Sequence, residues 1–313
     1  MNKVAIIGAG IMGHGIAQAC AQGKKTVVLI DAFEQALENS KVKIKENVQL
    51  LIENGLVEND TLEAILGRIT YSPKMEDAKD AQIVIEVVPE RADIKKDVFR
   101  QLSKICSEKC ILATNTSGTP ITEIAKMCTH PERVIGTHFF QPAHLIPIVE
   151  IIQTDVTDQK VIEETIKFIE EIGKVPAHIK KDIPGFVANR LQHALSREAM
   201  SLVQKGIVST EDLDKIVIGS FAPRMIFTGP MGQRDMNGLD THIFVNEYLY
   251  KDLEDAKEPL QIIKDKVAEG ALGVKAGKGF YDWTGQSAID IYNKKNDELI
   301  ALLKFLKARE KKQ

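Results

Sequence analysis

The stretch Val4-Ala-Ile-Ile-Gly8-Ala-Gly10-Ile-Met-Gly13 decides the fold of this chain. Its four leading apolar residues predict a buried strand, and a helical pattern begins directly after the glycines. Gly8 permits a tight turn, Gly10 lets the backbone approach a pyrophosphate, and Gly13 lets the helix pack closely on the strand. The helix N-terminus then offers backbone N–H groups to phosphates, so the stretch predicts dinucleotide binding. The expected contacts are Gly8, Gly10, Ile11, Met12 and Gly13.

The second strand-like run, residues 26–30, ends at Asp31, about 20 residues downstream of the glycines. An acid at this place binds the ribose hydroxyls of a dinucleotide and repels a 2′-phosphate. The basic cluster expected of an NADP site does not follow it. The expected cofactor is therefore NAD.

Alternating strand-like and helical runs fill the first part of the chain. Expected strands are 4–7, 26–30, 82–87, 111–114, 133–137, 148–152 and 175–179, with helices at about 12–22, 33–54, 91–108 and 159–172. This alternation predicts an α/β, Rossmann-type domain with a mostly parallel sheet over residues 1–183. Beyond a Pro/Gly-punctuated connection, helical periodicity dominates, with a last amphipathic helix from 286 onward. We expect an all-helical domain over residues 184–313.

Composition limits the class of protein. Of 313 residues, 44% are hydrophobic and 27% charged, as in a soluble globular protein, and the net charge of −3 argues against nucleic acid as a partner. No apolar run reaches the roughly 18 residues of a membrane span, and no secretory leader is apparent. We therefore expect a cytoplasmic protein. The spacing of the four cysteines does not fit a zinc site, so no metal is expected.

His138 is the strongest candidate for catalysis. Oxidation of a secondary alcohol needs a base for the hydroxyl proton, and an imidazole oriented by a carboxylate suits that role. His138 ends a strand-like run, and Glu150 in the next run is placed to face it. A strand-end histidine taken alone is more often structural. Glu90 follows another strand and would lie beside the nicotinamide ribose, or else in a solvated loop.

Several sequence blocks, taken together, resemble the L-3-hydroxyacyl-CoA dehydrogenase family over roughly residues 1–283. The blocks are Gly8–Gly13, Ile85–Glu90, Asn115-Thr-Ser-Gly118, His138-Phe-Phe-Gln-Pro142, Val149-Glu150, Asp182-Ile-Pro-Gly-Phe-Val-Ala-Asn-Arg190, Gly229-Pro-Met-Gly232, Gly238-Leu-Asp240 and Gly277-Lys-Gly-Phe-Tyr281. The resemblance implies an NAD-binding N-terminal domain and a helical C-terminal domain that forms a homodimer and closes the substrate cleft.

The resemblance also assigns roles to single residues. The family's catalytic pair falls on His138 and Glu150, and the groups that bind the substrate oxygen fall on Ser117 and Asn189. Without the resemblance, Ser117 could simply cap the helix near Pro120, and Asn189 could be a surface amide. The implied contacts on the nicotinamide side are Glu90, Lys95, Ser117, Gln141 and Lys275, with Gln141 where the family usually has asparagine.

Departures from the family pattern bear on the substrate. Members that act on acyl-CoA contact the CoA through a serine and a lysine, and the corresponding places here hold Asn47 and Asn54. Pro147 replaces a typical lysine, and Arg224 precedes the Gly-Pro block, as in relatives that act on free hydroxy acids. A guanidinium matches a carboxylate bidentately, so Arg224 is either a substrate clamp or part of a structural ion pair.

Three interpretations follow. The leading one is oxidation of a short-chain L-3-hydroxyacyl-CoA, such as 3-hydroxybutyryl-CoA, to the 3-keto product in fatty acid metabolism. The alternative is the same hydride transfer on a free hydroxy acid of the L-gulonate, L-carnitine or pyridine-carboxylate type. The third is a non-catalytic NAD-binding protein of the crystallin kind, which the set of catalytic residues disfavours.

Overall fold

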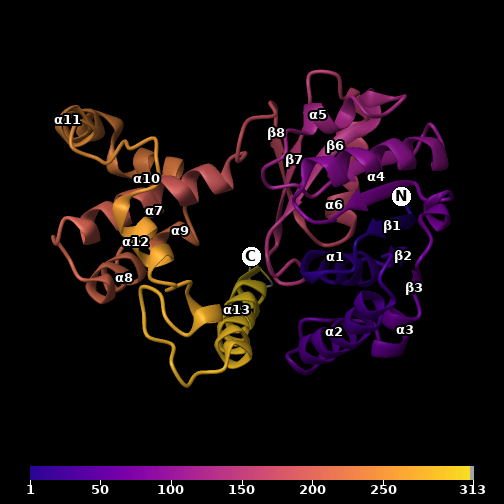
Figure 1. Ribbon diagram of the computed structural model, residues 1–313, viewed down its shortest axis with the longest axis horizontal. Helices are drawn as coiled ribbons and strands as arrows, with labels where there is room; N and C mark the ends of the chain where they lie inside the picture. Colours follow the sequence, from indigo (N-terminus) through magenta and orange to yellow (C-terminus); the bar gives the residue numbers. More distant parts are fainter. Residues whose placement is uncertain (311–313) are drawn as a thin grey trace. The chain divides into compact units, whose positions relative to one another are not determined.

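The computed structural model describes residues 1–310, and in it an eight-stranded sheet organises the N-terminal part of the chain (Figure 1). The strands are β1 (Lys3–Ile7), β2 (Thr26–Ile30), β3 (Ile69–Ser72), β4 (Ile83–Glu86), β5 (Ile111–Thr114), β6 (Val134–Phe139), β7 (Ile148–Ile152) and β8 (Val175–Ile179). Their order is β3-β2-β1-β4-β5-β6-β7-β8, and every neighbouring pair is parallel except β6 and β7. The predicted α/β class with a mostly parallel sheet is confirmed.

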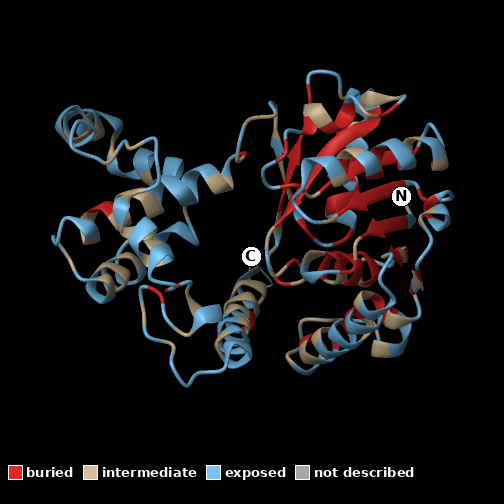
Figure 2. Ribbon diagram, viewed as in Figure 1, coloured by how far each residue is buried: buried red, intermediate tan, exposed pale blue. Residues whose placement is uncertain are grey.

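Helices cover both faces of this sheet. They are α1 (Ile11–Gln22), α2 (Glu34–Glu53), α3 (Leu62–Leu66), α4 (Ala92–Ile105), α5 (Ile121–Ala125) and α6 (Gln159–Glu171), with short 3₁₀ helices η1 (Met75–Ala78) and η2 (Pro131–Arg133). Side chains alternate along a strand, so Val4 and Ile6 pack with α1, α2 and α6, while Ala5 and Ile7 pack with α4 and α5. The buried residues concentrate in and around the sheet (Figure 2).

Strand β3 was not predicted from the sequence. It is a four-residue edge strand in which only Ile69 and Ser72 are buried, so its apolar pattern is too short to register as a strand. The strand is held by its parallel pairing with β2, which the local sequence pattern does not reveal.

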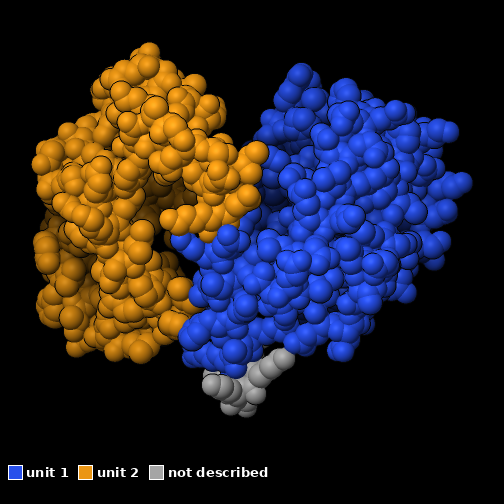
Figure 3. Space-filling view, turned by 90° about the horizontal axis from the view of Figure 1, so that it is seen from below, with its two compact units in different colours: residues 1–187, 295–313 blue, residues 188–294 orange. Residues whose placement is uncertain are grey.

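The chain divides into two compact units, residues 1–187 with 295–313 and residues 188–294 (Figure 3). The second unit contains α7 (Ala188–Gln204), α8 (Thr210–Gly219), α9 (Ala222–Met225), α10 (Pro230–Asn237), α11 (Leu239–Leu249), α12 (Gln261–Ala268) and η3 (Val274–Ala276). Ser209 caps α8 by accepting a hydrogen bond from the backbone N–H of Asp212 at 3.0 Å. Helices α8 to α12 bury none of their residues in this single chain.

The last helix, α13 (Ala288–Glu310), differs from the expected domain plan. We expected the helical domain to run to residue 313, whereas residues from 295 onward group with the first unit. The physical reason is an apolar contact: Ile300 is buried together with Leu51 of α2 and Leu145 of the β6–β7 loop. Lys307 adds an ion pair to Glu58 at 3.1 Å. The tail is therefore part of the first unit's packing.

Within the described part of the chain, no helix combines the length and the apolar character needed to cross a membrane.

Candidate active site

The glycine turn between β1 and α1 is built to admit a phosphate group. Gly8 adopts φ +112°, and a Cβ there would lie 2.9 Å from the carbonyl oxygen of Val87. A Cβ on Gly13 would lie 1.8 Å from the carbonyl oxygen of Gly8, so only glycine lets the helix approach the strand this closely. Gly10, in contrast, has open space where a Cβ would stand. No side chain caps the helix at Gly10, which leaves backbone N–H groups of its first turn for an anion.

Asp31 lies against the same turn. Its two carboxylate oxygens accept hydrogen bonds from the backbone N–H of Ala9 at 2.7 Å and of Phe33 at 2.9 Å. Each oxygen retains further acceptor capacity, as a ribose hydroxyl would require. Next to the turn, Ile11 is exposed and Met12 is half-buried. The residues present fit an NAD molecule at this edge of the sheet.

Three side chains form a chain of hydrogen bonds beyond the carboxyl end of β5. The antiparallel pairing of β6 with β7 places His138 directly opposite Glu150. His138 Nδ1 lies 2.8 Å from Glu150 Oε2, and His138 Nε2 lies 3.0 Å from Ser117 Oγ. Because the carboxylate can only accept at Nδ1, the imidazole carries its proton there and leaves Nε2 as an acceptor. This arrangement can take a proton from a bound hydroxyl group.

The loop that bears Ser117 is tied to the end of β6. Asn115 Oδ1 accepts a hydrogen bond from the backbone N–H of Phe139 at 2.8 Å. The bond fixes the spacing between the loop after β5 and the histidine strand. Asn115 thereby holds Ser117 within reach of His138.

Glu90 is held by the same loop. It accepts hydrogen bonds from the hydroxyls of Thr116 and Thr119 and from the backbone amides of Gly118 and Thr119. Burial works against its charge, but the hydrogen bond from Thr116, the charge of Lys95 and the bonds from Thr119 outweigh burial and lower the pKa of Glu90 to about 2. Glu90 is therefore a fixed negative charge beside the loop that bears Ser117.

Acid is expected to weaken the first unit through Glu90. Its pKa is about 2 in the folded chain and about 4.3 in an unfolded one. Its stabilising contribution is therefore complete above about pH 4.3 and is lost as the pH falls toward about 2. We expect the urea midpoint of the wild type to fall more steeply between about pH 5 and about pH 3 than that of Glu90→Gln. Equal slopes for the two proteins would contradict this assignment.

Lys95 is buried and forms an ion pair beneath the Ser117 loop. The family resemblance implies a contact with the nicotinamide; in this chain the side chain is 1% exposed and its Nζ lies 2.9 Å from Oε1 of the fully buried Glu86. Oε2 of Glu86 accepts a further bond from the hydroxyl of Thr114 at 2.7 Å. Burial raises the pKa of Glu86, against the pull of Lys95. Lys95 Nζ is also 3.4 Å from Glu90 Oε2, so its charge acts on both carboxylates.

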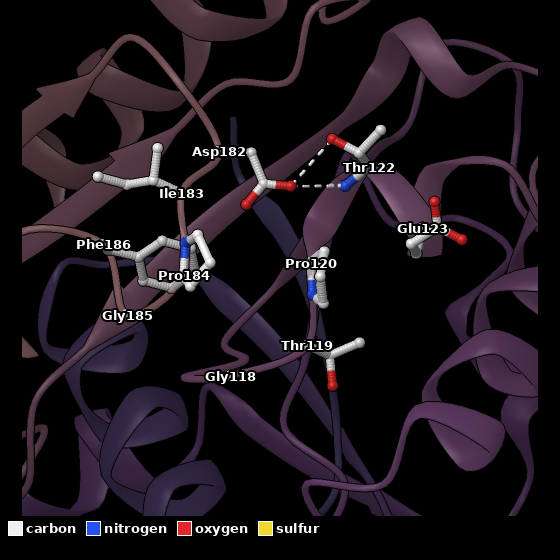
Figure 4. Close-up of a pocket in the computed structure, with 10 residues that line it drawn as sticks. All are labelled: Gly118, Thr119, Pro120, Thr122, Glu123, Asp182, Ile183, Pro184, Gly185 and Phe186. Carbon is white, nitrogen blue, oxygen red and sulfur yellow. Dashed lines mark hydrogen bonds between the residues drawn. The ribbon is translucent and has the colours of Figure 1, made fainter. Parts of the chain in front are cut away.

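A hollow of about 290 Å³ opens beside the Ser117 loop. Residues 118–120, 122 and 123 line one side and residues 182–186 line the other (Figure 4). Asp182 points toward Thr122 and accepts hydrogen bonds from its amide and its hydroxyl, each at 2.9 Å. Phe186 lines the hollow and also contacts His138, with ring centroids 5.4 Å apart. The hollow is therefore adjacent to the histidine.

The remaining predicted residues divide between the two units. Gln141 is exposed in the turn after β6, two residues beyond the end of that strand. Asn189 lies in the first turn of α7, Arg224 in α9 and Lys275 in η3, all in the second unit. The structure thus brings together Ser117, His138, Glu150 and Glu90 within the first unit.

Sequence reasoning assigned no role to Phe186, Thr116 or Thr119. The two threonines lie on either side of Ser117. This run of hydroxyl groups was the sequence feature that could have indicated a binding site for the Glu90 carboxylate. Phe186 stood in a family block, but nothing local indicates that its ring reaches His138.

Comparison with known proteins gives matches along most of the chain. The family model described as 3-hydroxyacyl-CoA dehydrogenase, NAD binding domain, matches residues 3–183, and that described as 3-hydroxyacyl-CoA dehydrogenase, C-terminal domain, matches residues 185–283. The 5-formyl-3-hydroxy-2-methylpyridine 4-carboxylate 5-dehydrogenase of Mesorhizobium japonicum is 33% identical, covering 99% of this chain and all of its own.

Two solved structures extend the comparison. A 5-formyl-3-hydroxy-2-methylpyridine 4-carboxylic acid 5-dehydrogenase, described as an NAD⁺-dependent dismutase, has a TM-score of 0.92 at 32% identity, with 98% of this chain and 99% of that chain covered. The (S)-3-hydroxybutyryl-CoA dehydrogenase of Ralstonia eutropha has a TM-score of 0.76 at 34% identity, with 91% and 99% covered.

Proposed function

Because this chain belongs to the 3-hydroxyacyl-CoA dehydrogenase family and is an NAD-dependent oxidoreductase, we propose that His138 is the base that accepts the hydroxyl proton during oxidation of a secondary alcohol. The observation that carries this proposal is the hydrogen-bonded series Ser117–His138–Glu150. Glu150 holds the tautomer in which Nε2 is free to accept a proton, and it stabilises the imidazolium that results. The glycine turn and Asp31 would hold NAD, which would supply the hydride acceptor.

Other residues would place the reacting groups. Ser117 and Asn189 would donate hydrogen bonds to the substrate oxygen, where negative charge develops. Glu90, Gln141 and Lys275 would line the nicotinamide side. These roles rest on the family resemblance, supported for Ser117 by its distance of 3.0 Å to His138.

For the substrate, we propose a free hydroxy acid in preference to a CoA thioester. The place that would hold the CoA-contacting lysine is Asn54, and its Oδ1 lies 3.4 Å from Lys304 Nζ of α13. Lys307 reaches the carbonyl oxygens of Gly55 and Leu56, each at 3.5 Å. Helix α13 thus contacts the C-terminal end of α2, where the CoA group of a thioester substrate would have to bind. The higher TM-score with the pyridine-carboxylate enzyme, over nearly the whole chain, supports a free carboxylic acid without a CoA carrier, although the group named as reacting in that enzyme's substrate is a formyl group.

A second candidate is 3-hydroxybutyryl-CoA, a substrate that would place the enzyme in fatty acid metabolism. It is favoured by the 34% identity with a 3-hydroxybutyryl-CoA dehydrogenase over 91% of this chain. NADH formation at 340 nm separates the candidates, with 3-hydroxybutyryl-CoA, free 3-hydroxybutyrate, L-carnitine, L-gulonate and 5-formyl-3-hydroxy-2-methylpyridine 4-carboxylate as the panel. Turnover of the thioester alone would overturn the free-acid proposal. Absence of NADH and of any oxidised or reduced product with every compound would count against both.

Arg224 is proposed as the carboxylate clamp of the free acid. Its guanidinium is exposed on α9 and has no ion pair among residues 1–310. Arg224→Lys keeps the charge but loses the bidentate geometry, so we expect KM for the best acid to rise at least about tenfold, because a hydrogen bond to a charged group contributes about 1.5–3 kcal/mol. Arg234→Lys in α10 is the matched control. An unchanged KM in the Arg224 variant would exclude the clamp.

We further propose that the second unit joins a second copy of this chain. Large apolar side chains are exposed on its helices, among them Ile218 at 68%, Met231 at 76%, Met236 at 71% and Phe244 at 69%. Helices that bury so little in one chain need a partner surface to cover their apolar faces. Light scattering at micromolar protein should give about twice the chain mass of 34.7 kDa. A monomer would overturn the homodimer.

A further inference from the structure

The segment that precedes the second unit touches both members of the His138–Glu150 pair. The ring of Phe186 is 2% exposed and meets the imidazole edge-on, at 5.4 Å between centroids and 61° between planes. The backbone N–H of Val187 donates to Glu150 Oε1 at 3.2 Å. Glu150 therefore presents one oxygen to His138 and the other to this segment.

The backbone of this segment is unusual. Gly185 has φ +75°, which suits glycine, but Phe186 has φ +48°, in the left-handed region that a bulky residue rarely occupies. The amide of Phe186 donates to the carbonyl oxygen of Ile183 at 3.0 Å, which closes the turn. Such a conformation is disfavoured for a bulky residue and persists where the surroundings hold it. Glycine or asparagine would adopt it more readily, so the aromatic ring is the feature that distinguishes this position.

The geometry around the imidazole shows what the ring does. Phe140 meets the same imidazole edge-on, at 4.6 Å between centroids, so two aromatic rings contact one histidine. Aromatic rings in contact favour edge-to-face or offset-stacked arrangements over others. Together with the Glu150 bond, they leave the imidazole few orientations in a site where His138 is 4% exposed.

We propose that Phe186 is a positioning residue for the catalytic histidine. Its ring holds the imidazole plane, and the turn that it completes delivers the Val187 amide to Glu150, so that Oε2 remains directed at Nδ1. The proposal rests on the proposed function of His138, but Phe186 itself need not contact substrate or cofactor. Misplacement of the imidazole by about 1 Å is enough to lower turnover by up to about a hundredfold.

The test compares three substitutions at position 186 with an exposed phenylalanine. Phe186→Ala removes the ring, Phe186→Leu retains apolar volume without the ring, and Phe186→Gly also relieves the left-handed backbone. Phe305→Ala on α13, where the ring is 55% exposed, is the control. We expect kcat to fall about ten- to hundredfold in all three variants at position 186, with KM for NAD within about twofold of the wild type. Phe186→Leu should keep most of the thermal stability, because it leaves the smallest cavity.

A second readout does not depend on turnover. A histidine Nδ1–H proton that is bonded to a buried carboxylate gives a separate downfield ¹H NMR signal, which His138→Gln identifies by removing it. We expect this signal to shift or disappear in the variants at position 186 and to persist in Phe305→Ala. An unchanged signal with unchanged kcat in Phe186→Leu or Phe186→Gly would overturn the positioning role. A different result separates the two proposals: His138→Gln retains full activity, but the NMR signal changes in the variants at position 186. In that case the proposed role of His138 as the base fails, while Phe186 is still shown to orient its imidazole.

Discussion

Replacing His138 with glutamine is expected to lower kcat by about 10²- to 10⁴-fold, the usual contribution of a positioned general base. Glutamine can still donate a hydrogen bond toward Glu150, but its amide cannot accept the hydroxyl proton. The glycine turn and Asp31 are untouched, so KM for NAD should remain within about twofold. The measurement is NADH formation at 340 nm with the best substrate of the panel.

The matched control for this prediction is His178→Gln. His178 is exposed on β8, where its Nε2 lies 2.7 Å from Gln153 Oε1. It should retain wild-type kcat. If His138→Gln also stayed within about twofold of the wild type, His138 would not be the base.

The largest effect on stability is expected from Lys95→Met. The substitution leaves the carboxyl of Glu86 0% exposed, with the hydrogen bonds from Thr114 and Val88 but without its counter-charge. Breaking a buried ion pair on one side costs about 3–5 kcal/mol of unfolding free energy. Urea unfolding followed by circular dichroism measures the loss. Lys96→Met is the control, because Lys96 lies near the surface, 3.6 Å from Glu123, and exposed pairs contribute about 0–1 kcal/mol.

The pH dependence of Lys95→Met has a definite sign. Burial already raises the pKa of Glu86, and loss of Lys95 removes a group that lowers it. A carboxyl with a raised folded pKa is favourable below its unfolded pKa and becomes unfavourable as the pH rises through the folded value. The loss of unfolding free energy caused by Lys95→Met should therefore become smaller as the pH falls toward about 4. The double variant with Glu86→Gln should recover part of the loss at neutral pH, and a single-variant cost below about 1 kcal/mol would contradict the assignment.

Local sequence was sufficient to predict the elements that depend on hydrophobic periodicity or on turn residues. The apolar runs predicted most strands because those strands are buried on both faces, and the glycine spacing predicted the cofactor turn. The spacing of His138 and Glu150 pointed to their facing arrangement because the two runs follow each other along the chain.

Contacts between distant segments could not be predicted in this way. Lys95 lies on an amphipathic helix, where a lysine ordinarily faces solvent, and only the packing of α4 against β4 buries it beside Glu86. The left-handed conformation of Phe186 has no local sequence signal. The apolar positions of α13 predicted a helix but not the surface on which it packs.

The packing of α13 also has a consequence for the order in which the protein is made. The hydrogen bond between Lys304 and Asn54 joins residues 250 apart in sequence. Ribosomes add about 5–20 residues per second, and N-terminal domains generally begin to fold as they emerge. Here Leu51 and Leu145 are synthesised long before Ile300, which covers them. The nascent first unit therefore exposes this apolar surface until Ile300 has been synthesised.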